Sequence, residues 1–580
     1  MDLKVPKEWE GQTEVLPQRL EMWVGEKGDS PFFYYGEEDK TLTFKEFNAL
    51  ANQIANNLIS LGVQKGDRVC LLLTNPYVST LSMFGIWKCG AIFAPINFNY
   101  AARQIAFQVK DTKPAFLIAG VNFSAIINQI QDELKEVKTI IYRPKPGDHD
   151  YDQAAENSEV NFTTLDYESL LTGNDQNPNV ELYPYDIANI IYTSGTTGLP
   201  KGVVHSYRWI NNYTYNRRMP LNDEDVIYTD LPMYHIAGAH SEVGSAAWVG
   251  CQIAVWDKFS PTQFWDRIRK CGATTAILLD VMVPWLMSAP ESPDDRRNSL
   301  NKVPMVPMVG NHRQVAKRFG FDLIISGYSS TEAGSALTGV IDEELDEGEG
   351  TPADLWKGMS KEELRRVYES NNIQYVSGKS ELAKKGWIGI PSNYHRARIV
   401  DEHGMEVPQG VVGEILLQPK LEHWMLEEYF GRPEATVKAI RDFWYHSGDA
   451  VYQDVSGHYI FVDRIGSVIR RRGENISPMQ IEEAVNAMPE VVMSAAFPVP
   501  AEEGDEDEVA LAVVPQEGVV LDEAEFRAAL AKELPRFMIP KYIEFRDSLP
   551  MTGSNKVEKY KLRQEVIDVK GLKEKSGVRR

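Results

Sequence analysis

The hydrophobic positions in the first part of the chain follow two patterns. Between residues 44 and 61 they recur every three or four residues, which is the spacing of one face of a helix. Thr43 and Glu46 stand where a capping box begins such a helix, and Gly62 stands where it ends. The apolar run at 68–73 predicts a buried strand, and residues 77–90 predict a second helix. This β-α-β order predicts an α/β fold.

Two later segments are strongly acidic. Residues 341–350 combine acidic residues with glycine, and a second capping box at Ser360 and Glu363 predicts a short polar helix near 364–368. We interpret 341–385 as a surface insertion. The acidic run at 502–508 lies between two apolar runs that predict strands, so a solvated loop is the simplest interpretation.

Composition narrows the function classes. The chain has 580 residues, which favours two or more domains, and a net charge of −22, which opposes general binding to nucleic acid or to anionic membrane. The 4 cysteines lack zinc-finger spacing and are too few for a disulfide framework. Neither a signal peptide nor an apolar stretch long enough to span a membrane is visible. We therefore expect a cytoplasmic protein with no integral membrane segment.

Residues 191–203 form the most informative segment. Glycines, hydroxyl residues and one lysine follow directly after an apolar strand, a composition that cradles phosphate through backbone N–H groups, hydroxyls and a point charge. The candidate phosphate ligands are Thr193, Ser194, Gly195, Thr196, Thr197, Gly198 and Lys201. Their spacing does not match the Walker pattern, so an ordinary NTPase is excluded.

Several further motifs occur in a fixed order after this loop. They are Leu231 to Gly238, Tyr328-Ser-Ser-Thr-Glu332, Trp444 to Asp449, Asp463-Arg464 and Pro550 to Lys556. With the phosphate loop, they resemble the adenylate-forming superfamily, and within it the acyl-CoA ligases. The resemblance covers most of the chain. It implies an α/β fold with a large N-terminal domain of mixed sheets sandwiched by helices, at 1–463, and a small mobile α+β domain at 464–580.

The resemblance also implies roles for the first half-reaction, in which ATP activates a carboxylate. Glu332 and Thr196 would hold Mg²⁺, Thr331 would contact the α-phosphate, and Tyr328 would stack near adenine. Ribose would be bound by Asp449, with Arg464 contacting ribose or phosphate, while Lys556 would be the catalytic lysine and His235 would lie near the carboxylate. An ionised Asp suits two vicinal hydroxyls, and a mobile ammonium suits the charge of the transition state.

For the second half-reaction, the resemblance places coenzyme A against the C-terminal domain, near Arg471, Arg472 and Gly473. The chain departs from the family pattern at three places. Asn555 precedes the lysine where glycine is usual, Gly466 replaces a hinge Asp or Lys, and Asn311-His312 replaces small residues near the adenine side. Because glycine absorbs large backbone changes, the swivel of the domain is retained as an expectation.

The leading hypothesis is an ATP-dependent acid–CoA ligase that uses ATP, Mg²⁺, coenzyme A and a small-molecule carboxylic acid. The alternatives are an enzyme that loads a separate acyl carrier protein, a luciferase-like oxidative activity, and a non-catalytic nucleotide-binding protein. The sequence leaves open the identity of the acid and the oligomeric state, with a homo-oligomer among the alternatives.

Overall fold

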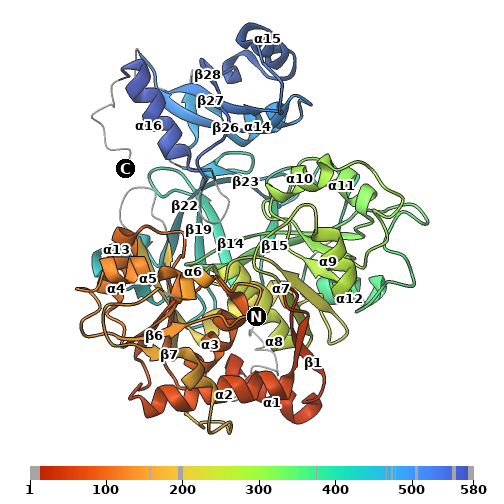
Figure 1. Cartoon of the computed structure of the whole chain (residues 1–580). Helices are drawn as coiled ribbons and strands as arrows, with labels where there is room; N and C mark the ends of the chain where they lie inside the picture. Colours follow the sequence, from red (N-terminus) through yellow and green to blue (C-terminus); the bar gives the residue numbers. More distant parts are fainter. Residues whose placement is uncertain are drawn as a thin grey trace.

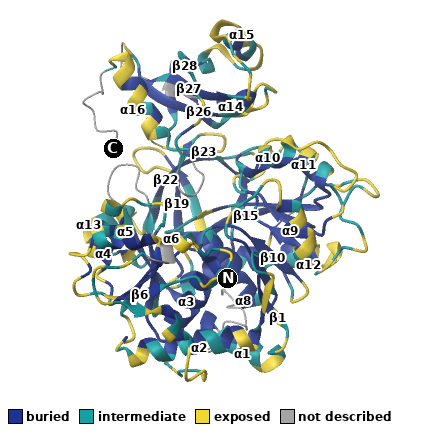
Figure 2. Cartoon of the chain, viewed as in Figure 1, coloured by how far each residue is buried: buried dark blue, intermediate teal, exposed yellow. Residues whose placement is uncertain are grey.

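The computed structural model describes residues 14–156, 158–193, 200–373, 375–465, 467–471, 474–476, 478–502, 507–551 and 557–572. A large N-terminal lobe carries most of the chain, and a small C-terminal lobe sits above it, beyond strand β23 (Figure 1). This is the α/β architecture that the sequence predicts. Figure 2 shows that the sheets and the helices between them form the buried interior of both lobes.

Three sheets build the large lobe. The first has the order β20 (Glu428–Tyr429), β9 (Lys201–Ser206), β8 (Ile187–Thr193), β4 (Ile92–Pro95), β3 (Arg68–Leu72), β5 (Phe116–Gly120), β6 (Lys138–Tyr142) and β7 (Leu165–Asp166). The second has the order β12 (Thr275–Ala276), β10 (Val226–Thr229), β11 (Gln252–Val255), β1 (Pro31–Tyr35) and β2 (Lys40–Thr43). In the first sheet, strands β3, β4, β5 and β6 run parallel to one another, which confirms the predicted β-α-β order.

The third sheet carries most of the later motifs. Its order is β13 (Lys302–Pro304), β14 (Leu323–Ser330), β15 (Gly334–Asp342), β17 (Trp387–Pro391), β23 (Tyr459–Arg464), β22 (Trp444–Gln453), β19 (Gly413–Pro419) and β18 (His395–Val400). Strand β16 (Tyr375–Ser377) pairs with β15, and β21 (Ile440–Arg441) pairs with β22. The small lobe contains the ribbon β24 (Ile469–Arg471) with β25 (Glu474–Ile476), and the sheet β26 (Val491–Pro500), β27 (Asp507–Pro515) and β28 (Tyr542–Phe545).

Helices cover the faces of these sheets. In the large lobe they are α1 (Leu16–Lys27), α2 (Phe44–Ser60), α3 (Pro76–Lys88), α4 (Ala102–Thr112), α5 (Ser124–Gln129), α6 (Gln153–Glu156), α7 (Tyr207–Arg218), α8 (Ser245–Val249), α9 (Phe264–Cys271), α10 (Met282–Ser288), α11 (His312–Phe319), α12 (Lys361–Ser370) and α13 (Pro433–Ala439). A π-helix, η5, spans Ala237–Gly244, and short 3₁₀ turns span Val121–Phe123, Tyr167–Leu171 and Arg536–Met538. The small lobe has α14 (Pro478–Asn486), α15 (Glu523–Glu533) and α16 (Lys559–Lys570).

Both predicted capping boxes are present. The Thr43 side chain accepts from the Glu46 backbone N–H, and the Glu46 carboxylate accepts from the Thr43 N–H at the start of α2. Gly62 follows the helix with φ of 102°, a conformation that glycine adopts at little cost. Ser360 and Glu363 repeat the arrangement at α12. The predicted strands on either side of the 502–508 run are β26 and β27, which pair antiparallel.

The interpretation of 341–385 as a surface insertion is wrong for its central part. Leu364 and Tyr368 of α12 are fully buried against Leu323 and Val340 of the third sheet, and β16 extends that sheet beside β15. Another tie is made by His312, whose Nδ1 lies 2.6 Å from Glu343 Oε1 and whose Nε2 lies 2.8 Å from the Ala383 carbonyl oxygen. The central part of the segment therefore packs against the core of the large lobe through one face of α12, and His312 anchors both ends.

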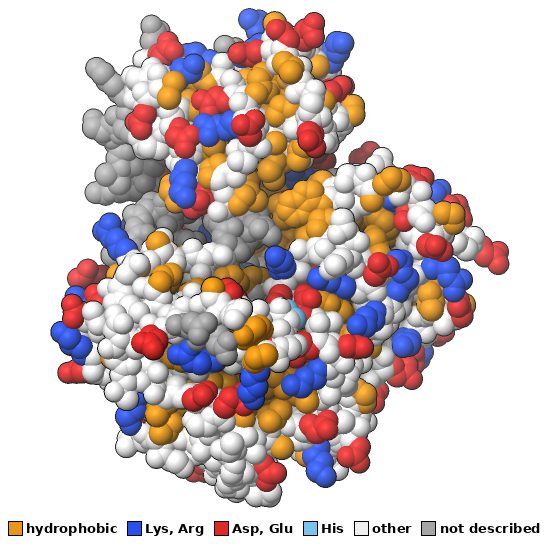
Figure 3. Space-filling view, in the orientation of Figure 1, with side chains coloured by type: hydrophobic (Ala, Val, Ile, Leu, Met, Phe, Trp, Pro, Cys, Tyr) orange, Lys and Arg blue, Asp and Glu red, His pale blue; other side chains and the backbone are white. Residues whose placement is uncertain are grey.

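Charged side chains of both signs are intermixed over the face shown in Figure 3, and hydrophobic side chains gather where the two lobes approach each other. All four cysteine thiols are free, and three of them are buried. Among the helices of the described residues, none combines the length and the apolar character needed to cross a membrane.

Candidate active site

The glycine-rich phosphate loop connects strands β8 and β9. Thr193 and Lys201 are directly opposite each other in the antiparallel register, so the loop leaves and re-enters the sheet at one point. Ser194, Gly195, Thr196, Thr197 and Gly198 lie outside the described residues. The structure thus fixes the two ends of the loop, with a hydroxyl at one end and the Lys201 ammonium at the other.

Lys201 is connected to Glu332 through the ring of Tyr429. The Lys201 Nζ atom lies 4.6 Å from the centroid of the Tyr429 ring, within the range of a cation–π contact. The Tyr429 hydroxyl donates a hydrogen bond of 2.8 Å to Glu332 Oε1. Strand β20 brings Tyr429 here because it pairs with β9 next to the loop. A lysine, a tyrosine and a carboxylate from three distant motifs therefore meet at the loop.

Two buried polar residues hold the backbone of the turn that carries Thr331 and Glu332. His205 Nε2 lies 2.8 Å from the Thr331 carbonyl oxygen, and Asn212 Nδ2 donates to the Ala333 carbonyl oxygen at 2.9 Å. Both side chains are completely buried. These hydrogen bonds satisfy backbone carbonyls that would otherwise be unpaired, so the turn has a fixed conformation.

A second cluster joins three predicted residues on the third sheet. Asp449 on β22 and Arg464 on β23 are cross-strand partners, and Arg464 Nε lies 3.0 Å from Asp449 Oδ1. On the other side, the Tyr328 hydroxyl donates a hydrogen bond of 2.5 Å to Asp449 Oδ2. Because Tyr328 and Glu332 lie on one strand and the turn after it, this cluster adjoins the phosphate loop.

Asp449 is the buried centre of this second cluster, with an exposed fraction of 2%. Burial raises the pKa of its carboxyl, and the Arg464 charge and the Tyr328 hydrogen bond oppose that shift. Its Oδ1 atom is buried and accepts no hydrogen bond of good geometry from the described residues. An acceptor of this kind fits a ribose hydroxyl, because a donor there would supply the missing hydrogen bond.

His235 stands at the entrance to the π-helix η5. Its Nδ1 accepts a hydrogen bond of 3.1 Å from the Ala237 N–H, which leaves Nε2 as the nitrogen that carries the proton in the neutral ring. His240, one turn further on, is fully buried between Trp87 and Trp209 and neither of its ring nitrogens has a hydrogen-bond partner within the described chain. Burial lowers the pKa of His240 to about 3, so the imidazole is neutral.

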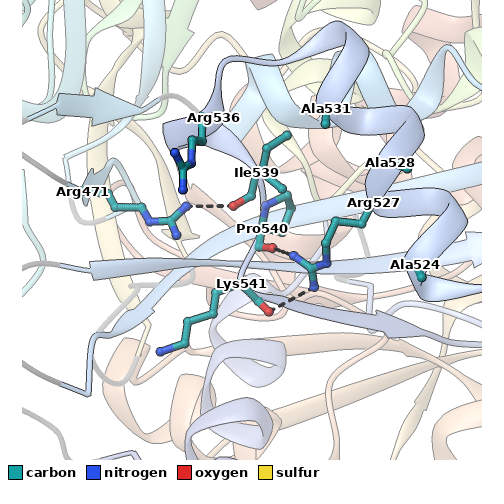
Figure 4. A pocket seen from close by; sticks show the side chains of 9 residues that line it. All are labelled: Arg471, Ala524, Arg527, Ala528, Ala531, Arg536, Ile539, Pro540 and Lys541. Carbon is teal, nitrogen blue, oxygen red and sulfur yellow. Dashed lines mark hydrogen bonds between the residues drawn. The ribbon is translucent and has the colours of Figure 1, made fainter.

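Arg471 lies in the small lobe, beside a depression of about 600 Å³ that is also lined by Arg527, Arg536 and Lys541 (Figure 4). Its guanidinium is largely engaged by the protein. Nη1 donates to the carbonyl oxygens of Phe537 and Ile539 at 3.0 and 2.8 Å, and Nε lies 2.7 Å from Glu508 Oε2.

The remaining predicted residues of the small lobe, Arg472, Gly473 and Lys556, lie outside the described part of the chain, as does Gly466. Lys559, at the start of α16, is described, and its Nζ lies 2.8 Å from Glu482 Oε1 and 3.8 Å from Asp463 Oδ2.

Sequence reasoning missed His205, Asn212, Tyr429 and His240. The first two lie in the strand and the helix directly after the phosphate loop. His205 follows two valines in β9 and could have indicated support for a neighbouring turn, whereas α7 has so many polar residues that Asn212 gives no signal of its own. Tyr429 gives no local signal, because its role depends on the pairing of β20 with β9.

The fold and these two adjoining clusters define the class of protein: the chain belongs to the family of AMP-binding enzymes. The AMP-binding enzyme family matches residues 20–429, and the AMP-binding enzyme C-terminal domain matches residues 480–556.

Among individual relatives, the chain is 30% identical to a crotonobetaine/carnitine–CoA ligase of Proteus mirabilis, over 90% of this chain and 92% of that one. Solved structures with the same fold include ATP-bound MatB from Rhodopseudomonas palustris, with a TM-score of 0.74, 23% identity, and coverage of 96% of this chain and 99% of that chain. Another is the anthranilate CoA ligase AuaEII in complex with anthranoyl-AMP, with a TM-score of 0.75, 19% identity, and coverage of 96% and 98%.

Proposed function

We propose that this chain is an AMP-forming acid–CoA ligase. In the first half-reaction, a carboxylate oxygen attacks the α-phosphorus of ATP and pyrophosphate leaves, giving an acyl-adenylate. In the second, the thiolate of coenzyme A attacks the acyl carbonyl and AMP leaves. The observation that carries the proposal is the continuity from Lys201 through Tyr429 and Glu332 to Tyr328 and Asp449, which joins the end where the phosphates would bind to the end where the ribose would bind.

The nucleotide would lie along this line. Asp449 would accept from the ribose hydroxyls, with Arg464 beside it, and the ring of Tyr328 would stack near adenine. The hydroxyls of the phosphate loop, with Lys201, would bind the phosphate oxygens.

Glu332 and Thr196 would hold Mg²⁺, whose chemistry is to neutralise phosphate charge. The half-buried carboxylate of Glu332 fits this ion, since oxygen is the ligand that Mg²⁺ prefers. The structure describes Glu332 but not Thr196.

The reacting groups would be bound from both lobes. His235 would lie near the substrate carboxylate, with Nε2 as its donor. We place the domain boundary between residues 463 and 464, so that Lys556 would be delivered by the small domain to stabilise charge at the α-phosphate. Arg471, Arg472 and Gly473 would lie along the path of coenzyme A.

The acid is expected to be small. The named relative acts on crotonobetaine or carnitine, so we include quaternary-ammonium acids with short aliphatic and aromatic acids as candidate substrates. We also infer that the enzyme works in the cytoplasm, in agreement with its free thiols.

The test is an acid panel in two assays. Acid-dependent exchange of pyrophosphate into ATP reports the first half-reaction, and acyl-CoA formation with free coenzyme A reports the second. We expect one class of acid to support both. Exchange without transfer to coenzyme A favours the second candidate, an enzyme that loads a separate carrier protein.

Lys556→Ala separates binding from chemistry in the same assays. We expect this variant to lose acid-dependent exchange while ATP binding is kept, since the lysine acts on charge that develops in the transition state. Lys561→Ala is the matched control on the same segment, because Lys561 is 47% exposed and pairs with Glu558. A Lys556→Ala variant with full exchange would falsify this assignment.

A further inference from the structure

Four side chains meet outside the active site, where strands of two different sheets end. Glu38 lies in the turn after β1, Asp257 follows β11, and His149 with Asp150 follows β6. His149 Nδ1 lies 3.3 Å from Glu38 Oε1 and 3.9 Å from Asp150 Oδ1. These three ligand atoms all lie within 4.8 Å of one another.

The second ring nitrogen of His149 is held by another carboxylate. His149 Nε2 lies 2.6 Å from Asp257 Oδ2, and Asp257 Oδ1 accepts a hydrogen bond of 2.8 Å from the Tyr35 hydroxyl. Tyr35 is fully buried, so this chain of contacts is anchored in the core. A histidine whose second nitrogen is held by a carboxylate is the arrangement that proteins use to orient metal ligands.

Asp150 is also held in place, with one carboxylate oxygen toward His149 Nδ1. Asn75 Nδ2 donates to Asp150 Oδ2 at 3.0 Å, while Asp150 Oδ1 is a buried atom with no hydrogen-bond partner in the described chain. The oxygen that faces His149 Nδ1 is therefore the one that lacks a donor. An unsatisfied buried acceptor is costly, and a cation would satisfy it.

The cluster carries uncompensated negative charge. Within the described residues, the only ion pairs of Glu38, Asp150 and Asp257 are with His149, and none involves a lysine or an arginine. The local potential thus favours a cation at this place.

We propose that Glu38, His149 and Asp150 form a binding site for a divalent transition-metal ion of the Zn²⁺ type, with Asp257 and Tyr35 positioning the imidazole. Ligand atoms of a tetrahedral zinc ion, with bonds of about 2.0–2.1 Å, are separated by roughly 3.3 Å. The distance from His149 Nδ1 to Glu38 Oε1 matches this value, and the distance of 3.9 Å to Asp150 Oδ1 would have to shorten on binding. One nitrogen and two oxygens suit Zn²⁺, Mn²⁺ or Co²⁺ better than Mg²⁺, which prefers oxygen alone.

The site is open to solvent and joins separate parts of the chain. The side chains of Glu38, His149 and Asp150 are 24%, 21% and 19% exposed, so an ion can enter and keep a water as a further ligand. Bound metal would link the turn after β1 to the loop after β6. It would therefore stabilise the junction of the first two sheets, apart from the residues to which we assign nucleotide binding.

The experiment uses the full chain, freed of metal and without nucleotide, at pH 7.5. Calorimetry with Zn²⁺ and absorption spectra with Co²⁺ should show a single site, and Zn²⁺ should raise the thermal midpoint. We expect His149→Ala and Asp150→Asn to weaken Zn²⁺ binding by about tenfold or more, and Asp257→Asn by about tenfold through the loss of imidazole positioning. His403→Ala is the matched control, since the His403 side chain is 77% exposed and lies 3.7 Å from one carboxylate, that of Glu402.

Folding is checked separately, by circular dichroism and the thermal midpoint without metal, and Asp150→Asn preserves the size of the side chain. The proposal is supported if the folded variants lose the Co²⁺ spectrum and the Zn²⁺-dependent rise in midpoint while His403→Ala keeps both. It is overturned if wild type and His149→Ala bind Zn²⁺ equally, or if wild type binds none.

Discussion

Two clusters that contain carboxylates in this molecule differ in how their negative charge is stabilised. In the candidate active-site cluster, Asp449 is almost completely buried and lies between Tyr328 and Arg464; all three are on strands of one sheet, and Arg464 is on the strand next to that of Asp449. In the cluster around His149, the carboxylates come from loops and remain about a fifth exposed. In the first cluster, strand register fixes the pairing of Asp449 with Arg464, whereas in the second cluster the partners meet only where strands end.

The difference follows from the cost of burying charge. A buried carboxylate must have permanent partners, because removing it from water costs several kcal/mol that only close opposite charge and hydrogen bonds offset. The desolvation cost of a partly exposed cluster is much smaller, so such a cluster can exchange one cation for another. We infer that the buried cluster is suited to positioning a ligand and the open cluster to reversible ion binding.

Removal of Asp449 should give the largest effect. Asp449→Ala would delete the charge-assisted hydrogen bonds that we propose to ribose and would leave Arg464 without its carboxylate partner, so we expect kcat/KM for ATP to fall about 100- to 1000-fold. The exchange assay with varied ATP measures this. Asp354→Ala, at a carboxylate that is 69% exposed and 3.9 Å from Arg297, should change nothing. Equal activity of both variants would contradict the buried-cluster assignment.

Substitution of Glu332 tests whether the buried cluster around Asp449 extends to the phosphate loop. Glu332→Gln keeps an oxygen that can accept from Tyr429 but removes the charge, so we expect about a 100-fold loss of exchange and a higher Mg²⁺ requirement. Tyr429→Phe removes only one hydrogen bond and should cost about tenfold or less. If Glu332→Gln left the Mg²⁺ dependence unchanged, the metal would be held elsewhere.

The pH dependence of ATP binding should show a smaller effect of the same burial. Because the pKa of Asp449 is raised, its protonation stabilises the folded state fully below the unfolded value of 3.8, and this contribution is lost as pH rises through the folded pKa. Under the proposed ribose role of Asp449, ATP needs the ionised form, so its affinity should fall severalfold as pH is lowered, at a higher pH than for an ordinary aspartate.

Calorimetric titration of ATP across the acidic pH range, with Asp449→Asn for comparison, measures this effect. The groups that face Asp449 and contribute to its pKa are Arg464, Tyr328, Asp463 and Glu332. The Asn variant should bind weakly with a flatter profile. The same slope in both proteins would assign the titration to another of these groups.

Much of the local structure was readable from the sequence. The capping box of Thr43 and Glu46, the strand at 68–72 and the helix at 76–88 all depend on contacts a few residues apart, and all are present. The order of motifs also identified the family. Its residue roles stay predictions, and those for Thr196 and Lys556 concern residues that the structure does not describe.

What the sequence could not give depends on contacts between distant segments. Tyr429 reaches Glu332 only because β20 pairs with β9, and His312 meets Glu343 across two elements. The acidic 341–385 segment was misread because Leu364 and Tyr368, four residues apart on α12, form a narrow apolar face among charged neighbours. Composition showed the charges, whereas burial depends on that one face.

Lys559 is about as exposed as the open cluster around His149 but lies between two carboxylates, and we expect a small effect there. Its side chain is 26% exposed and contacts Glu482 of the small lobe and Asp463 on β23. Burial lowers the pKa of Lys559, but these carboxylates outweigh it and raise the pKa. Since solvent screens a partly exposed pair, we expect Lys559→Met to reduce the free energy of unfolding by about 1 kcal/mol.

Lys561 provides the matched comparison on the same helix. It pairs with Glu558 and its side chain is 47% exposed, so Lys561→Met should change the free energy of unfolding by less than about 0.5 kcal/mol. Urea unfolding of both variants at neutral pH, in low salt and in about 1 M salt, measures the difference, which salt should reduce. Equal losses in the two variants would mean that Lys559 is as weakly coupled to its carboxylates as a surface lysine. At this contact, the strength of an ion pair would then not increase with its burial.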